Sequence, residues 1–350
     1  MACLVGAMLY VAFLYLRQAT ASIASGDPLR IIVSVDSSLQ GTLETATTAA
    51  TLVPTASFTQ AASQTPTSVL SPTSLPTVQQ AELLAKPRGK IVFTCTPEKF
   101  NQLCLMNADG SDQERLTNRQ VNDYYPSLSP DGRSVVFVSN QTGQFEIYIF
   151  DIQLREELSI TEGAGNLTAP EISPDDLWIV YASRRDGDSS IWLMRRDGSL
   201  PHPLTDSQWN EIDPTWSPDG AHITFAAVRG GFVELFVMNA DGSDIQQATH
   251  DVQGIGGRSS WSTDGRRLVF YAGPRGDRDI YVVEVATGQT TRLTFGGNNT
   301  GPGFSPDGAW IVFSSSRDGD HEIYIMRADG SEVTQLTDNT YDDWQPRWGP

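Results

Sequence analysis

The chain has 350 residues, with 24 Lys or Arg against 42 Asp or Glu, which gives a formal net charge of −18. The charges of residues 1–88 cancel, so residues 89–350 carry the whole acidic excess. A body this acidic repels phosphate backbones, which argues against a nucleic-acid partner.

Residues 1–25 begin with a run from Ala2 to Leu16 that carries no charge. As a helix this run reaches about 22 Å, which is short of the ~20 residues that span a bilayer. We expect residues 1–25 to form a membrane anchor that extends past Arg17, or the core of a cleaved signal segment. A buried soluble element is the third alternative. The first two place the rest of the chain outside the cytoplasm, either tethered or secreted into the periplasm or medium.

Residues 26–88 are expected to form a disordered linker. Between Ser37 and Gln80, 28 of 44 residues are Ser, Thr, Pro or Ala, and Glu44 is the only charged residue. Such a stretch cannot bury enough apolar surface to offset the entropy lost on ordering.

Residues 89–350 are periodic. The tetrapeptide Ser129-Pro-Asp-Gly132 recurs, with variants, at Ser173, Ser217, Ser262 and Ser305, in steps of 43–45 residues. A Pro stands three residues before each of these Ser residues, except before Ser262, where Ser259 takes its place. A period of 40–45 residues containing several short strands is the signature of propeller blades.

Each unit is predicted to contain four strands. A short strand such as 214–217 has Pro as its first residue, and a Pro-Asp-Gly turn leads to an apolar strand such as Val135–Phe137. In the unit of Ser173, Asp176 replaces the turn Gly, so this turn should be strained or of another type. A third strand such as Glu146–Ile149 follows, and the fourth ends in Leu-Thr or a variant.

The repeat predicts an all-β fold, a six-bladed propeller of four-stranded blades. The first unit lacks its first strand, and the segment 345–350 supplies one. This C-terminal strand should therefore complete the first blade and close the ring, which removes exposed strand edges. Cys95 and Cys104 should face each other across a hairpin of that blade, as a disulfide or as two buried thiols.

The pattern of Trp-Ser-Pro-Asp-Gly, then Ile-Val-Phe, Arg-Asp-Gly-Asp, Ala-Asp-Gly-Ser and Leu-Thr resembles the WD40-like repeat of the TolB-like bacterial β-propellers. The resemblance implies a six-bladed propeller that binds proteins in the periplasm. Where TolB-like proteins have an N-terminal α/β domain, this sequence has the apolar segment and the linker. The repeat is also similar to the propellers of tricorn-type and prolyl-oligopeptidase peptidases. Those peptidases have a hydrolase domain beside the propeller, and we expect no such domain within these 350 residues.

The sequence offers no motif for catalysis. A nucleophile-elbow pattern, a zinc-binding His-Glu-x-x-His and phosphate-binding loops are absent, and the four histidines lie in four different repeats. The pairs Asp186/Asp188, Asp277/Asp279 and Asp318/Asp320 suggest Ca²⁺, but they lack the closing Glu of an EF-hand. We therefore expect no enzyme activity and no cofactor, with Ca²⁺ as the alternative.

The loops that join consecutive units should lie on the same rim as the turns between the second and third strands. They carry aromatic and acidic residues, which recognition surfaces use. The candidates for partner binding are Tyr124, Asp186, Trp209, Glu211, Asp318, Tyr341 and Asp342. These features predict a non-catalytic extracytoplasmic protein that binds a protein or peptide, basic or neutral given the acidity of the chain. The alternatives are a sensor for a small ligand such as a glycan, and an enzyme with paired carboxylates at the channel mouth.

Overall fold

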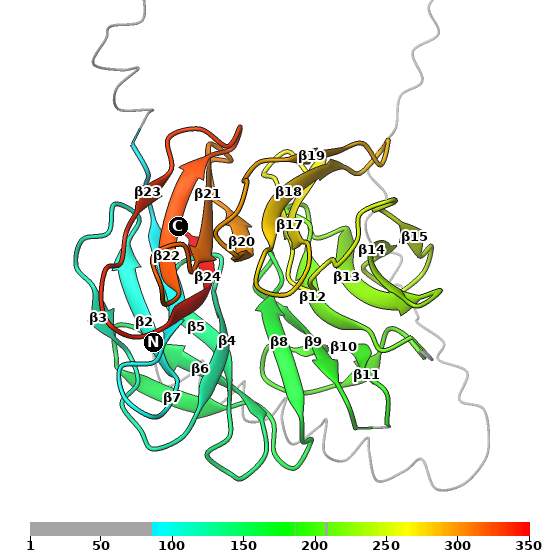
Figure 1. Ribbon diagram of the computed structural model, residues 1–350. Helices are drawn as coiled ribbons and strands as arrows, with labels where there is room; N and C mark the ends of the chain where they lie inside the picture. The colour runs from blue at the N-terminus through cyan, green and yellow to red at the C-terminus, as the bar shows by residue number, and fades with distance from the viewer. Residues whose placement is uncertain (1–85, 186, 207–208) are drawn as a thin grey trace, which may run out of the picture. The chain divides into compact units, whose positions relative to one another are not determined.

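The computed structural model describes residues 86–185, 187–206 and 209–350 (Figure 1). The predicted anchor at 1–25, nearly all of the linker at 26–88, and Asp186 lie outside these residues. Within the described ranges, no helix has both the length and the apolar character needed to cross a bilayer.

The described strands form six four-stranded antiparallel sheets, as the repeat predicted. We number these blades I to VI in chain order. Blade I contains β24 (Asp343–Gly349), β1 (Lys90–Cys95), β2 (Gln102–Asn107) and β3 (Glu114–Arg115). Blade II contains β4 (Asp123–Leu128), β5 (Ser134–Ser139), β6 (Glu146–Asp151) and β7 (Glu156–Ser159). Blade III contains β8 (Leu167–Ile172), β9 (Trp178–Ser183), β10 (Ser190–Arg195) and β11 (His202–Pro203).

Blade IV contains β12 (Ile212–Trp216), β13 (His222–Arg229), β14 (Phe232–Asn239) and β15 (Gln246–Gln247). Blade V contains β16 (Ser260–Trp261), β17 (Arg267–Ala272), β18 (Asp279–Glu284) and β19 (Thr290–Arg292). Blade VI contains β20 (Asn299–Phe304), β21 (Trp310–Ser315), β22 (Glu322–Arg327) and β23 (Thr334–Gln335). The first strand of a blade lies near the middle of the ring and the fourth at its edge (Figure 1).

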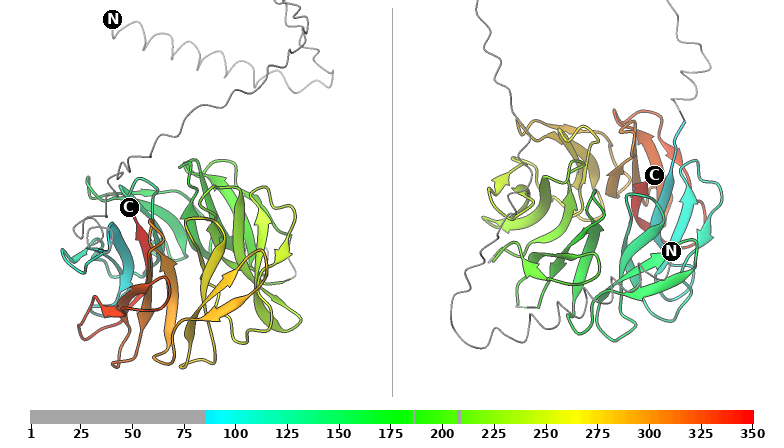
Figure 2. Two further views of the ribbon diagram at one scale, coloured as in Figure 1. Left: turned by 90° about the horizontal axis from the view of Figure 1, so that it is seen from above. Right: turned by 180° about the vertical axis from the view of Figure 1, so that it is seen from behind.

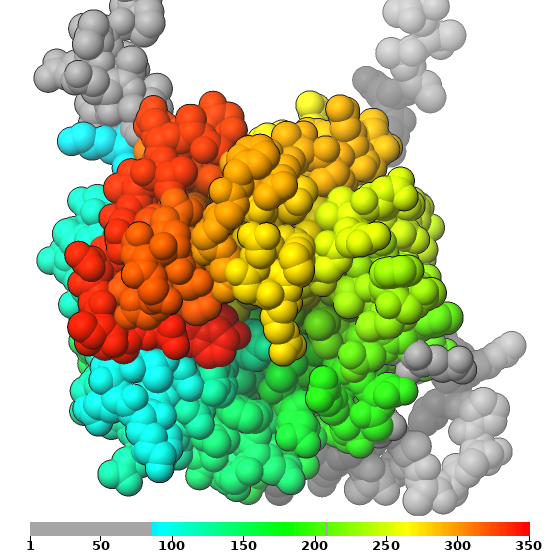
Figure 3. Space-filling model, viewed as in Figure 1, coloured from blue at the N-terminus to red at the C-terminus, as the bar shows by residue number. Residues whose placement is uncertain are grey.

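The C-terminal strand closes the ring. Strand β24 pairs antiparallel with β1, from Lys90 opposite Gly349 to Cys95 opposite Asp343. The red C-terminal segment accordingly lies beside the cyan first strand in the ribbon and space-filling views (Figures 2 and 3). The predicted completion of blade I by the C-terminal segment is therefore confirmed.

The hydrophobic core lies between the blades. Each of six buried clusters combines apolar side chains of two neighbouring blades. One joins Phe93 of blade I to Val312 of blade VI and includes Trp348 of β24. Another joins Val92 of blade I to Phe137 of blade II. Because the middle strands are covered on both sides, the central residues of these strands are mostly apolar, and charged residues stand at the strand ends.

The polar residues of the repeat stabilise its turns. The Ser129 hydroxyl donates to Asp131 Oδ1 (2.6 Å) and accepts from the backbone N–H of Ser134 (3.0 Å). Blades III to VI repeat this pair of bonds. Asp176 has φ +64°, so it keeps the turn of its Gly counterparts and holds a side chain in the left-handed region.

Five of the six inner strands are longer than predicted, and Pro is not their first residue. Strand β4 begins three residues before Pro126, and the ladder with β5 shifts register at this point. The residue before each Pro has a positive φ, namely Tyr125, Ala169, Asp213, Gly301 and Gln345. A bulge thus places the missing N–H of Pro where the ladder is already interrupted. Blade V, with Ser259 in place of Pro, has only the two-residue inner strand β16.

Cys95 and Cys104 form a disulfide in the structure, with their Cα atoms 5.9 Å apart. The register that the sequence suggested is wrong by two residues, because Cys95 lies opposite Gln102 and Cys104 lies opposite Phe93. The two cysteines are therefore diagonal neighbours on one face of the β1–β2 hairpin. A shift of two residues leaves the side chains on the same face, so the bond is still formed.

We expect reduction of this disulfide to lower the free energy of unfolding by about 2–3 kcal/mol, because the bond closes a loop of about ten residues in the unfolded chain. The melting temperature should fall by roughly 5–10 °C in reductant. A Cys95→Ala/Cys104→Ala variant should melt at the same temperature with and without reductant. Alkylation of both thiols in the unreduced, denatured protein would contradict the bond.

Candidate functional site

The bulged position of five inner strands, together with the equivalent repeat position in blade V, defines a set of six residues, one from each blade. They are Tyr125, Ala169, Asp213, Arg258, Gly301 and Gln345, and they stand directly before Pro or, in blade V, before Ser259. All except Ala169 line one cavity of about 350 Å³. Because the inner strands surround the axis of the ring, this cavity lies in the central channel.

The other lining residues place the cavity at one mouth of the channel. Arg275, Gly276, Arg278 and His321 come from the hairpins between the second and third strands of blades V and VI. Asn298 directly precedes the inner strand β20, and Trp344 is the second residue of the inner strand β24. The predicted common rim is confirmed by backbone bonds such as Asp343 N–H to His321 O (2.6 Å) and Asn299 N–H to Arg278 O (2.7 Å).

Below the mouth, the buried side chain of Arg347 and the half-buried side chain of Glu171 cross the channel. Arg347 of β24 donates to the carbonyls of Pro302 (3.2 Å) and Ser259 (2.9 Å), and its Nε lies 4.0 Å from Glu171 Oε2. Glu171 of β8 accepts from the Thr215 hydroxyl (2.9 Å) and the Trp216 N–H (2.9 Å). These two side chains therefore connect blades I, III, IV, V and VI across the axis.

Arg258 lies between this ion pair and the cavity. It is 6% exposed, and its Nη2 donates to the carbonyl of Pro126 (3.0 Å). Its guanidinium carbon lies 5.5 Å from the centre of the Tyr125 ring. Burial, together with the neighbouring Arg347, lowers the pKa of Arg258 to about 9. Arg258 is thus still a cation at neutral pH.

Asp213 and two tyrosines share the cavity with Arg258. The Asp213 carboxylate and burial both raise the pKa of Tyr125, so this phenol stays protonated. Burial raises the pKa of Asp213, and Arg258 and Arg347 oppose this shift. A Cβ atom on Gly257 would lie 2.0 Å from Asp213 Oδ2, and one on Gly256 would lie 2.0 Å from the Tyr271 ring. Only glycine at these two positions allows Asp213 and Tyr271 to approach the backbone of blade V.

Tyr124 is the predicted candidate that lies nearest to the channel mouth. Its hydroxyl accepts from Asn101 Nδ2 (2.8 Å), and its ring packs against Phe145 (5.6 Å) and Trp344 (5.7 Å). It lines a second cavity of about 210 Å³ that shares Tyr125, Trp344 and Gln345 with the first. The aromatic groups of two rim loops thus meet at one place.

Two candidates from the loop of blade IV differ in their surroundings. Trp209 is 43% exposed, and its ring lies 5.3 Å from the guanidinium carbon of Arg229. Glu211 is 1% exposed and accepts a hydrogen bond from the Thr205 hydroxyl. The expectation that Glu211 lies exposed on the rim is therefore wrong, because it stabilises the turn after β11.

The remaining candidates do not line the cavity. Asp318 is exposed on a hairpin of blade VI and accepts a hydrogen bond from the Tyr324 hydroxyl. Tyr341 packs on the core between blades VI and I, and Asp342 Oδ1 accepts from the His321 N–H (3.0 Å). Burial and Glu322 raise the pKa of the adjacent Asp343 to about 7, so this acidic loop is less charged than its sequence suggests. Asp186 lies outside the described residues.

The sequence analysis missed Asp213, Arg258, Tyr271 and Arg278. A signal for the first two was present in the repeat. The residues around the bulged position recur from blade to blade, whereas that position holds Tyr, Ala, Asp, Arg, Gly and Gln. A position that varies inside an otherwise constant repeat is not needed for the fold, which marks it as a place for function.

The structure gives no support to a metal centre among the residues that it describes. No three His, Cys, Asp or Glu side chains lie together there in a way that could hold an ion. In the pair Asp277/Asp279, Asp279 is buried and binds Arg292, Thr294 and the N–H of Gly296. The Asp-x-Asp pattern of this turn therefore serves the turn itself.

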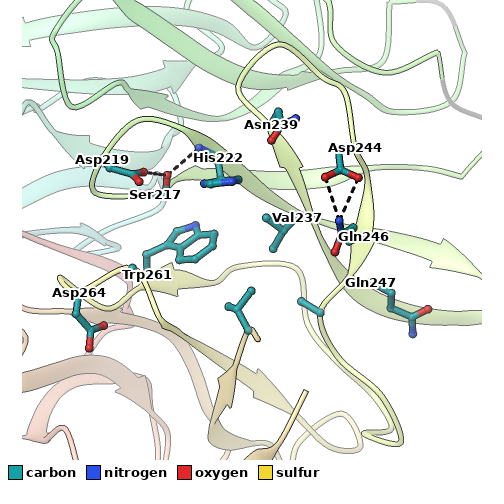
Figure 4. A pocket seen from close by; sticks show the side chains of 13 residues that line it. Ser217, Asp219, His222, Val237, Asn239, Asp244, Gln246, Gln247, Trp261 and Asp264 are labelled. Atoms are coloured by element: carbon teal, nitrogen blue, oxygen red, sulfur yellow. Dashed lines mark hydrogen bonds between the residues drawn. The ribbon is translucent and has the colours of Figure 1, made fainter. Parts of the chain in front are cut away.

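A further cavity, of about 290 Å³, lies between blades IV and V at the opposite end of the ring (Figure 4). Its polar groups mostly bind one another: Ser217 donates to Asp219 (2.6 Å), and Gln246 donates to Asp244 (3.0 Å). The Ser–Asp pair recurs in the other blades as part of a turn. This cavity is therefore a by-product of the repeat, and the channel mouth is the better candidate site.

The comparisons with known proteins agree with this architecture. The family described as TolB beta propeller domain matches residues 89–253 and 247–350. The Tol-Pal system protein TolB of Francisella tularensis (strain SCHU S4) is 45% identical over 47 residues, which are 13% of this chain and 11% of that protein. The match thus spans about a tenth of the relative's length.

Two solved structures are similar in fold. TolB from Acinetobacter baumannii has a TM-score of 0.66 and 22% identity, over 75% of this chain and 67% of that one. A protein from Agrobacterium tumefaciens, described as a candidate TolB, has a TM-score of 0.62 and 22% identity, over 76% of this chain and 99% of that one. With the six blades observed and the family match across residues 89–350, the chain belongs to the TolB β-propeller domain family.

Proposed function

We propose that this protein is a non-catalytic, extracytoplasmic propeller that binds a protein or peptide at the mouth of its central channel. The observation that carries this function is the cavity of about 350 Å³, which collects the residue at this one repeat position from five of the six blades. A rigid ring that presents varied side chains at a single hollow is suited to recognition.

Three further observations support the proposal. Tyr124, Trp344 and Phe145 form an aromatic cluster beside the cavity, and aromatic side chains dominate protein interfaces. The Cys95–Cys104 disulfide fits an oxidising compartment. The relative from Francisella is named a Tol-Pal system protein, which makes an assembly role reasonable for this chain. The apolar segment at 1–25 would tether the ring to a membrane or direct its export.

Site-specific photo-crosslinking of the full chain in its own cells tests this function. A photoreactive phenylalanine analogue at Arg275 or Trp209 samples the rim of the mouth, and one at Leu200, which is 62% exposed between β10 and β11, samples the other end. We expect the two rim positions to crosslink the same protein and Leu200 not to. Adducts from Leu200 alone, or a measured turnover, would refute the proposal.

A sensor for a small ligand such as a glycan is the second candidate. Tyr125, Tyr271 and Trp344 all line the cavity, whose volume lies within the range of small-molecule sites. Aromatic rings of this kind stack on sugars. A thermal-shift screen separates the two functions, because stabilisation by small sugars, with no crosslinked protein, favours the sensor.

A further inference from the structure

The charge of the channel mouth is opposite to that of the whole chain. The chain carries a formal net charge of −18. The residues that line the cavity include Arg258, Arg275 and Arg278 but only one carboxylate, Asp213. A positively charged cavity in an otherwise acidic protein attracts anionic ligands to that cavity.

Two of these cations have unused donors that are buried. Nε and Nη1 of Arg258 have no hydrogen-bond partner among the described residues, and neither has Nε of Arg278. Arg258 is more than nine-tenths buried. Leaving the donors of a buried cation unpaired is costly, and a ligand that supplies acceptors removes that cost. Arg258 is therefore poised to bind an anionic group.

The other walls of the cavity limit what this anion can be. Tyr125, Tyr271 and Trp344 provide apolar and aromatic surface beside the arginines. Asp213 already occupies part of the hollow with a carboxylate, which repels a doubly charged phosphate more than a single carboxylate. The arrangement thus fits one carboxylate attached to a chain with apolar atoms, as in an acidic side chain of a peptide.

We propose that the channel mouth binds an acidic peptide segment of the partner, with a carboxylate of that segment paired with Arg258. This inference rests on the proposed function and specifies the chemistry of its partner. It also reverses the expectation, drawn from net charge alone, of a basic or neutral partner. Arg275 and Arg278 guide the segment to the mouth, and the aromatic rings pack against its methylene groups.

The test measures the binding of hexaglutamate and hexaglutamine peptides, each labelled with a neutral fluorophore, to the full chain by fluorescence anisotropy. We expect hexaglutamate to bind and hexaglutamine to bind at least about 10-fold more weakly. Arg258→Met should weaken hexaglutamate binding about 10- to 100-fold, and the more exposed Arg275→Gln, which does not endanger folding, should weaken it severalfold. Asp213→Asn should strengthen it.

The control variant Arg133→Met removes the same charge from an exposed turn between β4 and β5, and it should bind like the unaltered chain. Equal binding of the two peptides, unchanged binding by both arginine variants, or displacement by inorganic phosphate at lower concentration than by acetate would overturn the inference. The rim crosslinks keep the two proposals apart. A partner that still crosslinks at Arg275 and Trp209 while hexaglutamate fails to bind leaves the function standing and removes only the acidic ligand.

Discussion

A chain that ends at Asp342 is expected to lose cooperative folding. The missing residues form β24, which pairs with β1 along its length and is the inner strand of blade I. Trp348 belongs to the cluster between blades VI and I, and loss of a buried Trp side chain alone costs about 3–5 kcal/mol. The backbone groups of β1 that pair with β24 also lose their partners. The total destabilisation therefore exceeds the free energy of unfolding of a typical domain. Near-ultraviolet circular dichroism and thermal melting measure the loss.

A chain that lacks only Pro350 is the control, because Pro350 follows β24 and is exposed. It should melt within a few degrees of the full chain. If the chain ending at Asp342 melted cooperatively at the temperature of the full chain, the closure by β24 would contribute no stability. The ring would then have to be held by the contacts of the other five blades alone.

The fold could be predicted because each step in its construction is local. The Pro-Asp-Gly turns, the apolar middle strands and the Leu-Thr endings are fixed by neighbours within about ten residues, and the period gives the number of blades. Even Asp176, the one turn residue that departs from Gly, keeps the same conformation. Asp175, its neighbour, still binds the Ser173 hydroxyl, so the turn network is preserved.

The site could be predicted only in part, because it depends on residues brought together from different blades. Tyr124 was selected from its loop composition, and the structure places it beside the mouth. Arg258 and Asp213 are in blades V and IV and approach each other only when these two blades pack together. Glu211 looked like an exposed acid in sequence, but the Thr205 hydroxyl holds it in the interior. The composition of a loop gives its residues but does not indicate which of their side chains are exposed and which are buried.

The register of the first hairpin shows the same limit on a smaller scale. The spacing of Cys95 and Cys104 indicated that they could meet, but it could not distinguish direct from diagonal neighbours. The bulges beside Tyr125 and Asp213 were also missed, because a Pro in sequence equally suits the start of a strand and a bulge. The distinction requires the pairing partner on the next strand.

The ion pair between Arg347 and Glu171 should make a large contribution to the free energy of unfolding. Arg347 is 8% exposed, and burial lowers its pKa while Glu171 opposes this shift. Removing Glu171 leaves Arg347 as an uncompensated buried charge, and removing Arg347 leaves the largely buried Glu171 without its cation. Loss of one partner of a buried pair costs about 3–5 kcal/mol. We therefore expect Arg347→Met to lower the melting temperature by roughly 10 °C, and Glu171→Gln to lower it too.

The double variant distinguishes the contribution of the ion pair to stability from that of the hydrogen bonds that each residue makes on its own. Replacing both charges by neutral groups of similar volume removes the uncompensated charge, so Arg347→Met/Glu171→Gln should be close to the unaltered chain in stability. Thermal melting of the four chains gives the coupling energy, and Arg133→Met, exposed and away from the channel, should change stability by less than about 0.5 kcal/mol. If the losses of the two single variants simply added in the double variant, the pair would not act as a unit, and the carbonyls of Pro302 and Ser259 would account for the role of Arg347.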